Sequence, residues 1–320
     1  MPTKRRGLIM PALYRSSNSF AMRKCLVVAV LASACVVCAC SKGDSSQTGD
    51  IGEKLYDISF RKACYKAFDA NGDGFLSADE ASAAERIEIS GTSYSTLAGY
   101  WEPGGFIECI PYAIEGLQYF PNLKYFGYYS NGIESIDLSG NSLLTELHLQ
   151  SEDLKKLVFP SPGSLKKMAL FLYGLKALTV PASVVELENV QCLELSELRF
   201  AEPSSLKVVG KECFHGCKQL KELVFPEGLE EVGYYAAGGL DGLELVSLPS
   251  TVKSLGTNAF ANCKSLRRLE IRAITPPSID RSFEEGSCAN RYSIFVPAQS
   301  LDVYKTAWPE YASRIHSLSN

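Results

Sequence analysis

The chain has 320 residues, of which 46% are hydrophobic and 21% are charged, and its formal net charge is −4. This apolar content is ample for the core of one or two domains and excludes a polar, disordered chain. The acidic excess disfavours nucleic acid and other polyanions as partners.

The first predicted element is a secretory signal. Two basic residues, Arg23 and Lys24, precede an uncharged run from Cys25 to Cys38. This run is shorter than the roughly 20 residues that a membrane-spanning helix needs. We therefore expect residues 1–39 to be a signal peptide, with either Met1 or Met22 as the true start.

The end of this signal contains a predicted lipidation site. The segment Val37–Cys40 resembles a bacterial lipobox, so we expect acylation at Cys40, with Cys35 as a weaker rival. Residues 40–50 are polar and predict a flexible tether. Residues 1–39 carry six basic and no acidic residues, so their removal leaves a formal net charge of −10. We expect a bacterial outer-membrane lipoprotein, held to the membrane by its lipid alone, at the cell surface or on the periplasmic face.

Residues 51–90 predict a small α-helical unit that resembles an EF-hand. Apolar residues recur at helical spacing from Ile51 to Phe68, and a second helix is expected to run through Arg86. The loop between them matches a calcium loop, and its expected ligands are Asp69, Asn71, Asp73, Phe75 through its carbonyl, Ser77 through water, and Glu80. We therefore expect one structural Ca²⁺ ion. The alternative is a metal-free capping box formed by Ser77 and Glu80.

A repeat region follows. Eleven of the 36 residues from Tyr94 to Tyr129 are aromatic, and residues 91–116 are expected to cap its N-terminal end. Over residues 117–273, short apolar strands recur, and from about Pro203 to Ile271 they keep a step of 23 residues. The aligned positions include Pro203, Pro226 and Pro249, and also Gly210, Gly233 and Gly256. A fixed period in this range predicts a solenoid, in which each repeat packs only against its neighbours.

The cysteines of the expected mature domain do not form a recognisable framework. Seven follow the signal region, an odd number without zinc-site spacing. Cys217 and Cys263 occupy the repeat position that holds Leu240 between them, which predicts an apolar core ladder. Cys213 and Cys217 flank His215, but two thiols and one histidine are an incomplete metal site.

The phrase from Asn258 to Ile271 (NAFANCKSLRRLEI) resembles the BspA-like type of leucine-rich repeat, and residues 274–320 resemble the C-terminal cap of such proteins. The similarity covers about residues 115–316, with departures at Ala236–Gly239 and at residues 182–198. It implies a repeat solenoid with a β-strand plus a turn or short helix in each repeat, preceded here by the EF-hand-like unit. It also implies a cell-surface lipoprotein that adheres to a host or bacterial surface protein.

The repeats also predict a binding surface. Side chains alternate along a strand, so the middle residue of each short strand should face solvent. These residues form one expected row: Asp137, His148, Val158, Thr179, Arg199, Val224, Ser247 and Glu270. Tyr125 and Tyr129 are expected to project near Asp137 and His148, and these four residues are the candidate ligand site. The alternative is that the tyrosines merely cap the end of the solenoid.

No motif in the chain predicts catalysis. None of the three histidines (His148, His215 and His316) lies in a zinc-protease motif, and no nucleophile elbow or phosphate-binding loop occurs. The expected function is therefore non-catalytic protein binding, with capture of a glycan as the alternative.

Overall fold

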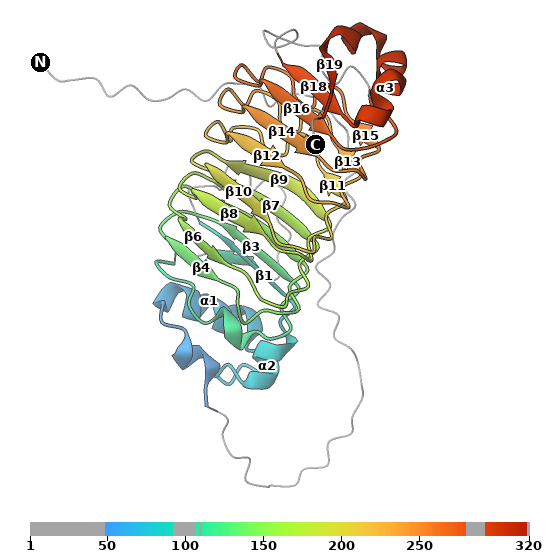
Figure 1. Ribbon diagram of the computed structural model, residues 1–320. Helices are drawn as coiled ribbons and strands as arrows, with labels where there is room; N and C mark the ends of the chain where they lie inside the picture. The colour runs from blue at the N-terminus through green and yellow to red at the C-terminus, as the bar shows by residue number, and fades with distance from the viewer. Residues whose placement is uncertain (1–48, 92–105, 109–110, 280–291, 319–320) are drawn as a thin grey trace, which may run out of the picture. The chain divides into compact units, whose positions relative to one another are not determined.

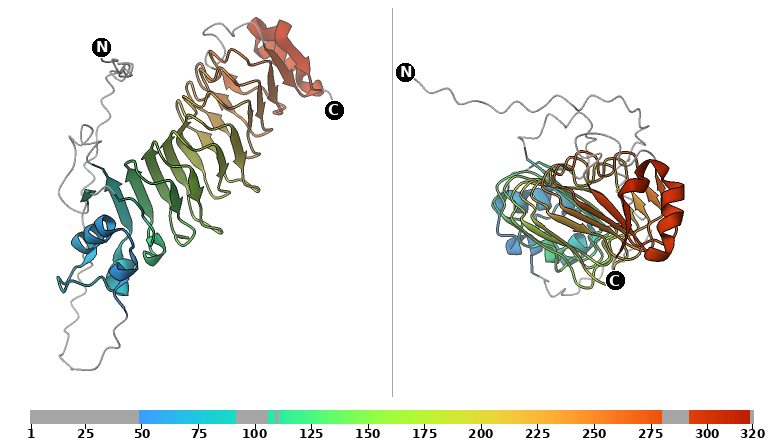
Figure 2. Two further views of the ribbon diagram at one scale, coloured as in Figure 1. Left: turned by 90° about the vertical axis from the view of Figure 1, so that its left-hand side faces the viewer. Right: turned by 45° about the horizontal axis from the view of Figure 1, so that its top comes forward.

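The structure is a computed structural model that describes residues 49–91, 106–108, 111–279 and 292–318. Contacts group residues 42–320 in one compact unit, and the description below refers to this unit. Successive coils of the chain stack on one another, and their strands lie on two faces (Figures 1 and 2). Neighbouring strands are parallel, and the predicted leucine-rich-repeat solenoid is confirmed.

One face is a continuous ten-stranded sheet, called here the long sheet. Its strands are β1 (Arg86–Ser90), β2 (Phe106–Glu108), β3 (Tyr125–Tyr129), β5 (Glu146–Ser151), β7 (Lys167–Leu172), β9 (Glu186–Cys192), β11 (Val208–Val209), β13 (Glu231–Val232), β15 (Ser254–Leu255) and β17 (Ser278–Ile279). The strand β1 pairs with both β2 and β3. The long sheet therefore starts within the range that the sequence assigned to the helical unit.

The second face consists of three shorter sheets. They are β4 (Ser135–Asp137) with β6 (Lys156–Val158); β8 (Ala177–Val180) with β10 (Glu197–Phe200); and β12 (Glu222–Val224), β14 (Leu245–Leu248), β16 (Arg268–Ile271), β18 (Ser293–Val296) and β19 (Ile315–Ser317). Between the described strands, this face is thus interrupted twice, after β6 and after β10.

Short helices occupy the two ends of the stack (Figure 1). They are η1 (Ile51–Lys54), α1 (Ile58–Phe68), α2 (Ala78–Ala83) and η3 (Leu117–Tyr119) at one end, and η4 (Ala298–Ser300), α3 (Leu301–Ala307) and η5 (Pro309–Arg314) at the other. The expectation that the second helix runs through Arg86 is wrong, because α2 ends at Ala83 and Arg86 begins β1. Ile87 and Ile89 are buried at a period of two, which is the pattern of a strand.

The coils have two lengths. In the early coils, hydrogen-bonded neighbours lie 21 residues apart, as in Thr145 to Lys124. In the later coils they lie 23 residues apart, as in Gly228 to Thr251. Strands that follow one another in the sequence alternate between the two faces, so the short and irregular early spacings are half-coil steps of a regular 21-residue period.

The core is a ladder of apolar side chains inside the stack. Cys217, Leu240 and Cys263 are all fully buried, as their shared repeat position predicted. Cys217 also donates its thiol to the carbonyl of Val190 at 2.9 Å and accepts the amide of Cys192 at 3.3 Å. These thiols therefore belong to the packing between coils.

Candidate binding surface

The structure divides the four predicted ligand residues between the two faces. Tyr125 and Tyr129 lie on β3 and His148 lies on β5, which are neighbours in the long sheet. Asp137 lies on β4 of the second face. The expectation of one row is therefore wrong at His148, because each coil turns from one face to the other between Asp137 and His148. The other seven members of the row lie on second-face strands.

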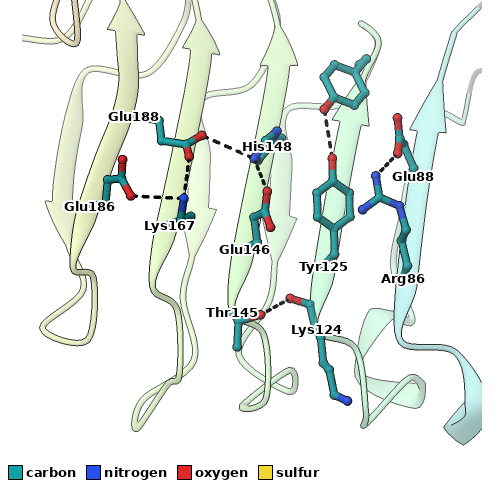
Figure 3. A network of polar contacts seen from close by, with 11 residues as sticks. Arg86, Glu88, Lys124, Tyr125, Thr145, Glu146, His148, Lys167, Glu186 and Glu188 are labelled. Atoms are coloured by element: carbon teal, nitrogen blue, oxygen red, sulfur yellow. Dashed lines mark hydrogen bonds and ion pairs between the residues drawn. The ribbon is translucent and has the colours of Figure 1, made fainter. Parts of the chain in front are cut away.

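Tyr125 and Tyr129 point outward as expected, but their side chains are half-buried. Phe126 and Tyr128, which alternate with them, are fully buried. The hydroxyls of Tyr125 and Tyr129 lie 3.2 Å apart (Figure 3). Burial, followed by the contact with Tyr125, raises the pKa of Tyr129 well above its ordinary value. This hydroxyl therefore stays protonated at neutral pH and is a hydrogen-bonding group, not a nucleophile.

Arg86 covers the ring of Tyr125. Its guanidinium lies 3.4 Å from the ring centroid and also binds Glu88 at 2.5 Å. On the neighbouring strand, the His148 ring lies 5.3 Å from that of Tyr125, at 53°. Cation–π and ring contacts thus occupy the surroundings of this aromatic face. A sugar could stack on Tyr125 only if Arg86 moved away.

Charged side chains continue this network across β5, β7 and β9 (Figure 3). His148 Nε2 lies 2.9 Å from a carboxylate oxygen of Glu146 and 4.0 Å from one of Glu188. The Lys167 ammonium lies 3.2 Å from both Glu186 and Glu188. These groups are partly exposed, so each pair adds little stability, but together they fix a patterned polar surface.

The exposed apolar part of this face lies beside the network. Phe171 and Tyr173 follow the outward positions of β7 and are 40% and 45% exposed, and Leu193 after β9 is 39% exposed. Phe171 stands in one cross-strand row with Gln150 and Gln191. Sequence reasoning missed these residues because the run from Lys167 to Leu172 was not recognised as a strand. A signal was available, since this run repeats the neighbouring strand at a distance of 21 residues.

Asp137 has a local role on the second face. Its carboxylate accepts the backbone amide of Ser139 at 2.8 Å. The side chain of Ser139, together with this amide, lowers the pKa of Asp137, and the contact holds the turn after β4. Asp137 therefore lies apart from Tyr125, Tyr129 and His148.

The predicted calcium loop has the backbone of an EF-hand turn. Gly74, at the sixth position, has φ +84°, which is the left-handed conformation that the sharp turn needs. Glu80, at the twelfth position, reaches back across the loop and accepts the amide of Ala70 at 2.9 Å. The oxygen donors and this turn fit Ca²⁺. Among the described residues, however, no three acidic, histidine or cysteine side chains are gathered as a metal-ligand cluster.

The carboxylates of this loop are bound to backbone amides instead. Asp69 accepts Gly72 at 2.8 Å, and Asp73 accepts Phe75 at 2.8 Å. Ser77 and Glu80 form the capping box that was the alternative interpretation. The Ser77 amide is the main cause of a lowered pKa of Glu80, so the carboxylate is charged at neutral pH. Calcium binding would exchange some of these hydrogen bonds for ion–oxygen contacts.

Several predicted features lie outside the described residues. They include Cys40, the signal segment and most of residues 91–105. Within the ranges that the structure does describe, no helix is both long enough and apolar enough to cross a membrane.

A family model described as BspA type leucine rich repeat region matches residues 145–267 and 189–307, in six copies. The two ranges together cover more than half of the chain. No match is found among curated proteins.

Three solved structures are similar to the chain. The pneumococcal vaccine antigen PcpA is 17% identical over 62% of this chain and 76% of that one, with a TM-score of 0.25. A leucine rich cell surface protein from Faecalibacterium prausnitzii is 15% identical over 59% of this chain and 61% of its own, less than two thirds, with a TM-score of 0.30. A leucine-rich repeat protein from Bacteroides ovatus is 15% identical over 73% and 76%, with a TM-score of 0.27. At identities this low, these structures transfer no function to the chain.

Proposed function

The chain belongs to the BspA-type leucine-rich-repeat family, and from this premise we propose that it binds another protein, without catalysis, through the outer face of its long sheet. The observation that carries the proposal is the group of Phe171, Tyr173 and Leu193, exposed beside the network of Arg86 to Glu188. A cluster of exposed apolar side chains rimmed by fixed charges is typical of a protein interface. Five strands from β1 to β9 present this face over about 20 Å.

The network disfavours the alternative of a glycan platform at Tyr125. Sugar stacking needs an open aromatic face, and Arg86 lies 3.4 Å above this one. The tyrosine hydroxyls are also paired with one another. Tyr125, Tyr129 and His148 therefore support the neighbouring interface, and Asp137 on the second face is not included in it.

The proposal is tested by binding of soluble protein that lacks residues 1–40 to an array of extracellular-matrix proteins, bacterial surface proteins and glycans. We expect binding to at least one protein target. The double variant Phe171→Ala, Tyr173→Ala should weaken it at least about tenfold, because exposed aromatic anchors carry most of the energy of an interface. Val303→Ala is the control, since Val303 is 53% exposed on α3 at the C-terminal end. Equal loss in both variants, or binding to glycans alone, would count against the proposal.

The proposed location is the bacterial cell surface, where the protein would act as an adhesin anchored by acylated Cys40. The support is the basic and apolar segment of residues 22–40, with its lipobox-like end. In an expressing bacterium, Cys40→Ser should shift the protein from the membrane fraction to the soluble fraction. Protease treatment of intact cells then separates surface display, which predicts digestion, from a periplasmic location.

We also propose one structural Ca²⁺ ion at the loop, held by Asp69, Asn71, Asp73, Glu80, the carbonyl of Phe75 and a water on Ser77. The support is the positive φ of Gly74 and the position of Glu80 across the loop. The bound ion would supply positive charge that ties the two helices together. At a calcium concentration of 100 times Kd, the free energy of unfolding should rise by about 2.7 kcal/mol.

The variant Glu80→Gln tests this calcium site against the capping box alone. Glutamine can still close a capping box but lacks the charge that calcium needs. We expect thermal unfolding of the wild type to shift upward with calcium relative to chelator, and Glu80→Gln to lose this shift. Asp79→Asn is the control, because Asp79 is the adjacent carboxylate and is not an expected ligand. An identical calcium response in Glu80→Gln would show that the ion does not bind at this loop.

A further inference from the structure

The second face is open between β10 and β12. Here the coil length changes, since β8 and β10 pair at a step of 20 residues whereas β12 and β14 pair at 23. On the long sheet the same coils stay joined, because β11 pairs with β9. Among the described strands, however, β10 pairs with β8 alone and β12 with β14 alone. The stack is thus closed on one face and open on the other.

Backbone groups line both sides of this opening. In a parallel sheet, successive residues bond alternately to the two neighbouring strands. Ala201 bonds to Val180 on the β8 side, so Leu198 and Phe200 turn their backbone groups toward β12. Phe225 bonds to Ser247 on the β14 side, so Glu222 and Val224 turn theirs toward β10. Both strands therefore present unpaired edges to the same space, and such edges are templates for an added strand.

The apolar side chains in the opening are incompletely covered. Leu198 and Phe200 point inward yet are partly exposed, whereas the matching Leu178 and Val180 of β8 are buried. The rings of Phe200 and Phe225 lie 5.9 Å apart. Val224, on the outer side of β12, is 47% exposed. The core of the solenoid is thus less well covered at this coil boundary than where the strands are paired.

The opening is large enough for a peptide. It encloses about 660 Å³, which lies within the usual range of about 300–1,000 Å³ for ligand pockets. The other interruption of this face, between β6 and β8, encloses about 240 Å³. The size therefore favours the opening between β10 and β12. Its rim carries both signs of charge, including Arg199, Lys221, Glu202 and Glu227, and so favours no strongly charged ligand.

We propose that this opening, the β10–β12 groove, binds an extended peptide segment of a partner protein as an added β-strand. The backbone of the peptide pairs with the free edges, and apolar side chains at alternate positions cover Leu198 and Phe200. Strand addition of this kind obtains affinity from main-chain hydrogen bonds and specificity from alternate side chains. The groove lies on the face opposite to Phe171, so the inference is independent of the proposed binding function of the long sheet.

The test uses a fluorescently labelled, amidated peptide that copies residues 221–228 (KELVFPEG). In the protein, the Leu and Phe of this phrase point inward from β12, so the peptide offers the required alternation. We expect saturable binding to the intact soluble protein. The same peptide with N-methylated Leu and Phe amides should not bind, because it cannot donate main-chain hydrogen bonds.

Matched variants locate the binding site. Val224→Asp places a charge at the groove and should weaken binding at least about tenfold. Val158→Asp makes the same change at the outward position of β6 and should leave binding unchanged. Phe171→Ala on the long sheet should also leave it unchanged, which separates this site from the proposed protein interface. Circular dichroism and thermal unfolding confirm that each variant is folded.

Three results would overturn the inference. They are no saturable binding of the peptide, equal binding of the N-methylated peptide, and equal loss in Val158→Asp and Val224→Asp. Concentration-dependent dimerisation that Val224→Asp abolishes would also overturn it, since the occupant would then be a second copy of the chain.

Discussion

The side chain of Asn141 joins two coils of the solenoid. It is fully buried, and its amide donates to the carbonyls of Leu117 at 2.8 Å and Phe120 at 3.1 Å. Its backbone also closes the turn between Leu138 and Leu144. An asparagine is needed here because it is small, tolerates the turn and carries two donors.

Replacing Asn141 should therefore destabilise the protein. Asn141→Ala leaves two buried carbonyls without partners, and we expect a loss of about 1–3 kcal/mol in the free energy of unfolding. Asn141→Asp should cost at least as much, since it sets an acceptor against these carbonyls. Asn122→Ala is the control, because Asn122 donates to Ser82 at an exposed position. Urea unfolding measures all three, and equal midpoints for Asn141→Ala and the wild type would refute this role.

Single residues were predictable where the reason is local. The strand alternation correctly places Tyr125 and Tyr129 outside and Phe126 and Tyr128 inside. The position of Arg86 over Tyr125 was not predictable, because the pair depends on the register of two strands 39 residues apart. The same limit separated Asp137 from His148, since a sequence does not state on which face of the coil each strand lies.

At the scale of elements, close contact between turns explains the aligned glycines. Gly210, Gly233 and Gly256 follow β11, β13 and β15 and lie above one another. A Cβ atom on Gly256 would lie 2.6 Å from the backbone nitrogen of Tyr234 and 2.7 Å from the carbonyl carbon of Gly233. Backbone atoms cannot yield at small cost, so the coils approach one another here only without a side chain.

The variant Gly256→Ala should therefore push neighbouring coils apart. We expect it to lower the free energy of unfolding by about 1–3 kcal/mol, the usual cost of overpacking. Gly49→Ala is the control, because a Cβ atom there meets nothing within 4 Å. Urea unfolding with an unchanged slope would assign the loss to the native state. A neutral Gly256→Ala would mean that the glycine ladder does not set the approach of the coils.

The elements were predictable to unequal degrees. The 23-residue coils were recognised because proline, glycine and cysteine recur at fixed positions. The 21-residue coils were not, because strands such as β5 and β6 alternate between faces and give spacings of half a coil. The strand β7 has the apolar sequence KMALFL without a following proline, and neither alternation nor a turn marked it as a strand.

At the scale of the whole molecule, the change of coil length divides the solenoid into two stretches. In a repeat protein, cooperativity depends on the interfaces between neighbouring coils. At the junction, the long sheet contributes the short pairing of Glu186 and Leu187 with β11, and β10 and β12 do not pair. This boundary is therefore the weakest link between described coils, and the two stretches can lose their structure separately.

The two destabilising variants provide a test of this division, because Asn141 lies before the junction and Gly256 lies after it. We expect calorimetric unfolding in two transitions, with Asn141→Ala lowering the temperature of one and Gly256→Ala that of the other. Separate transitions follow because a defect in one stretch reaches the other only through the junction, where few hydrogen bonds cross. Amides of Leu198 and Val224 should also exchange with solvent faster than those of Leu178 and Val246, which are in paired strands. One transition that both variants shift equally would show that the pairing of β9 with β11 suffices to couple the whole stack.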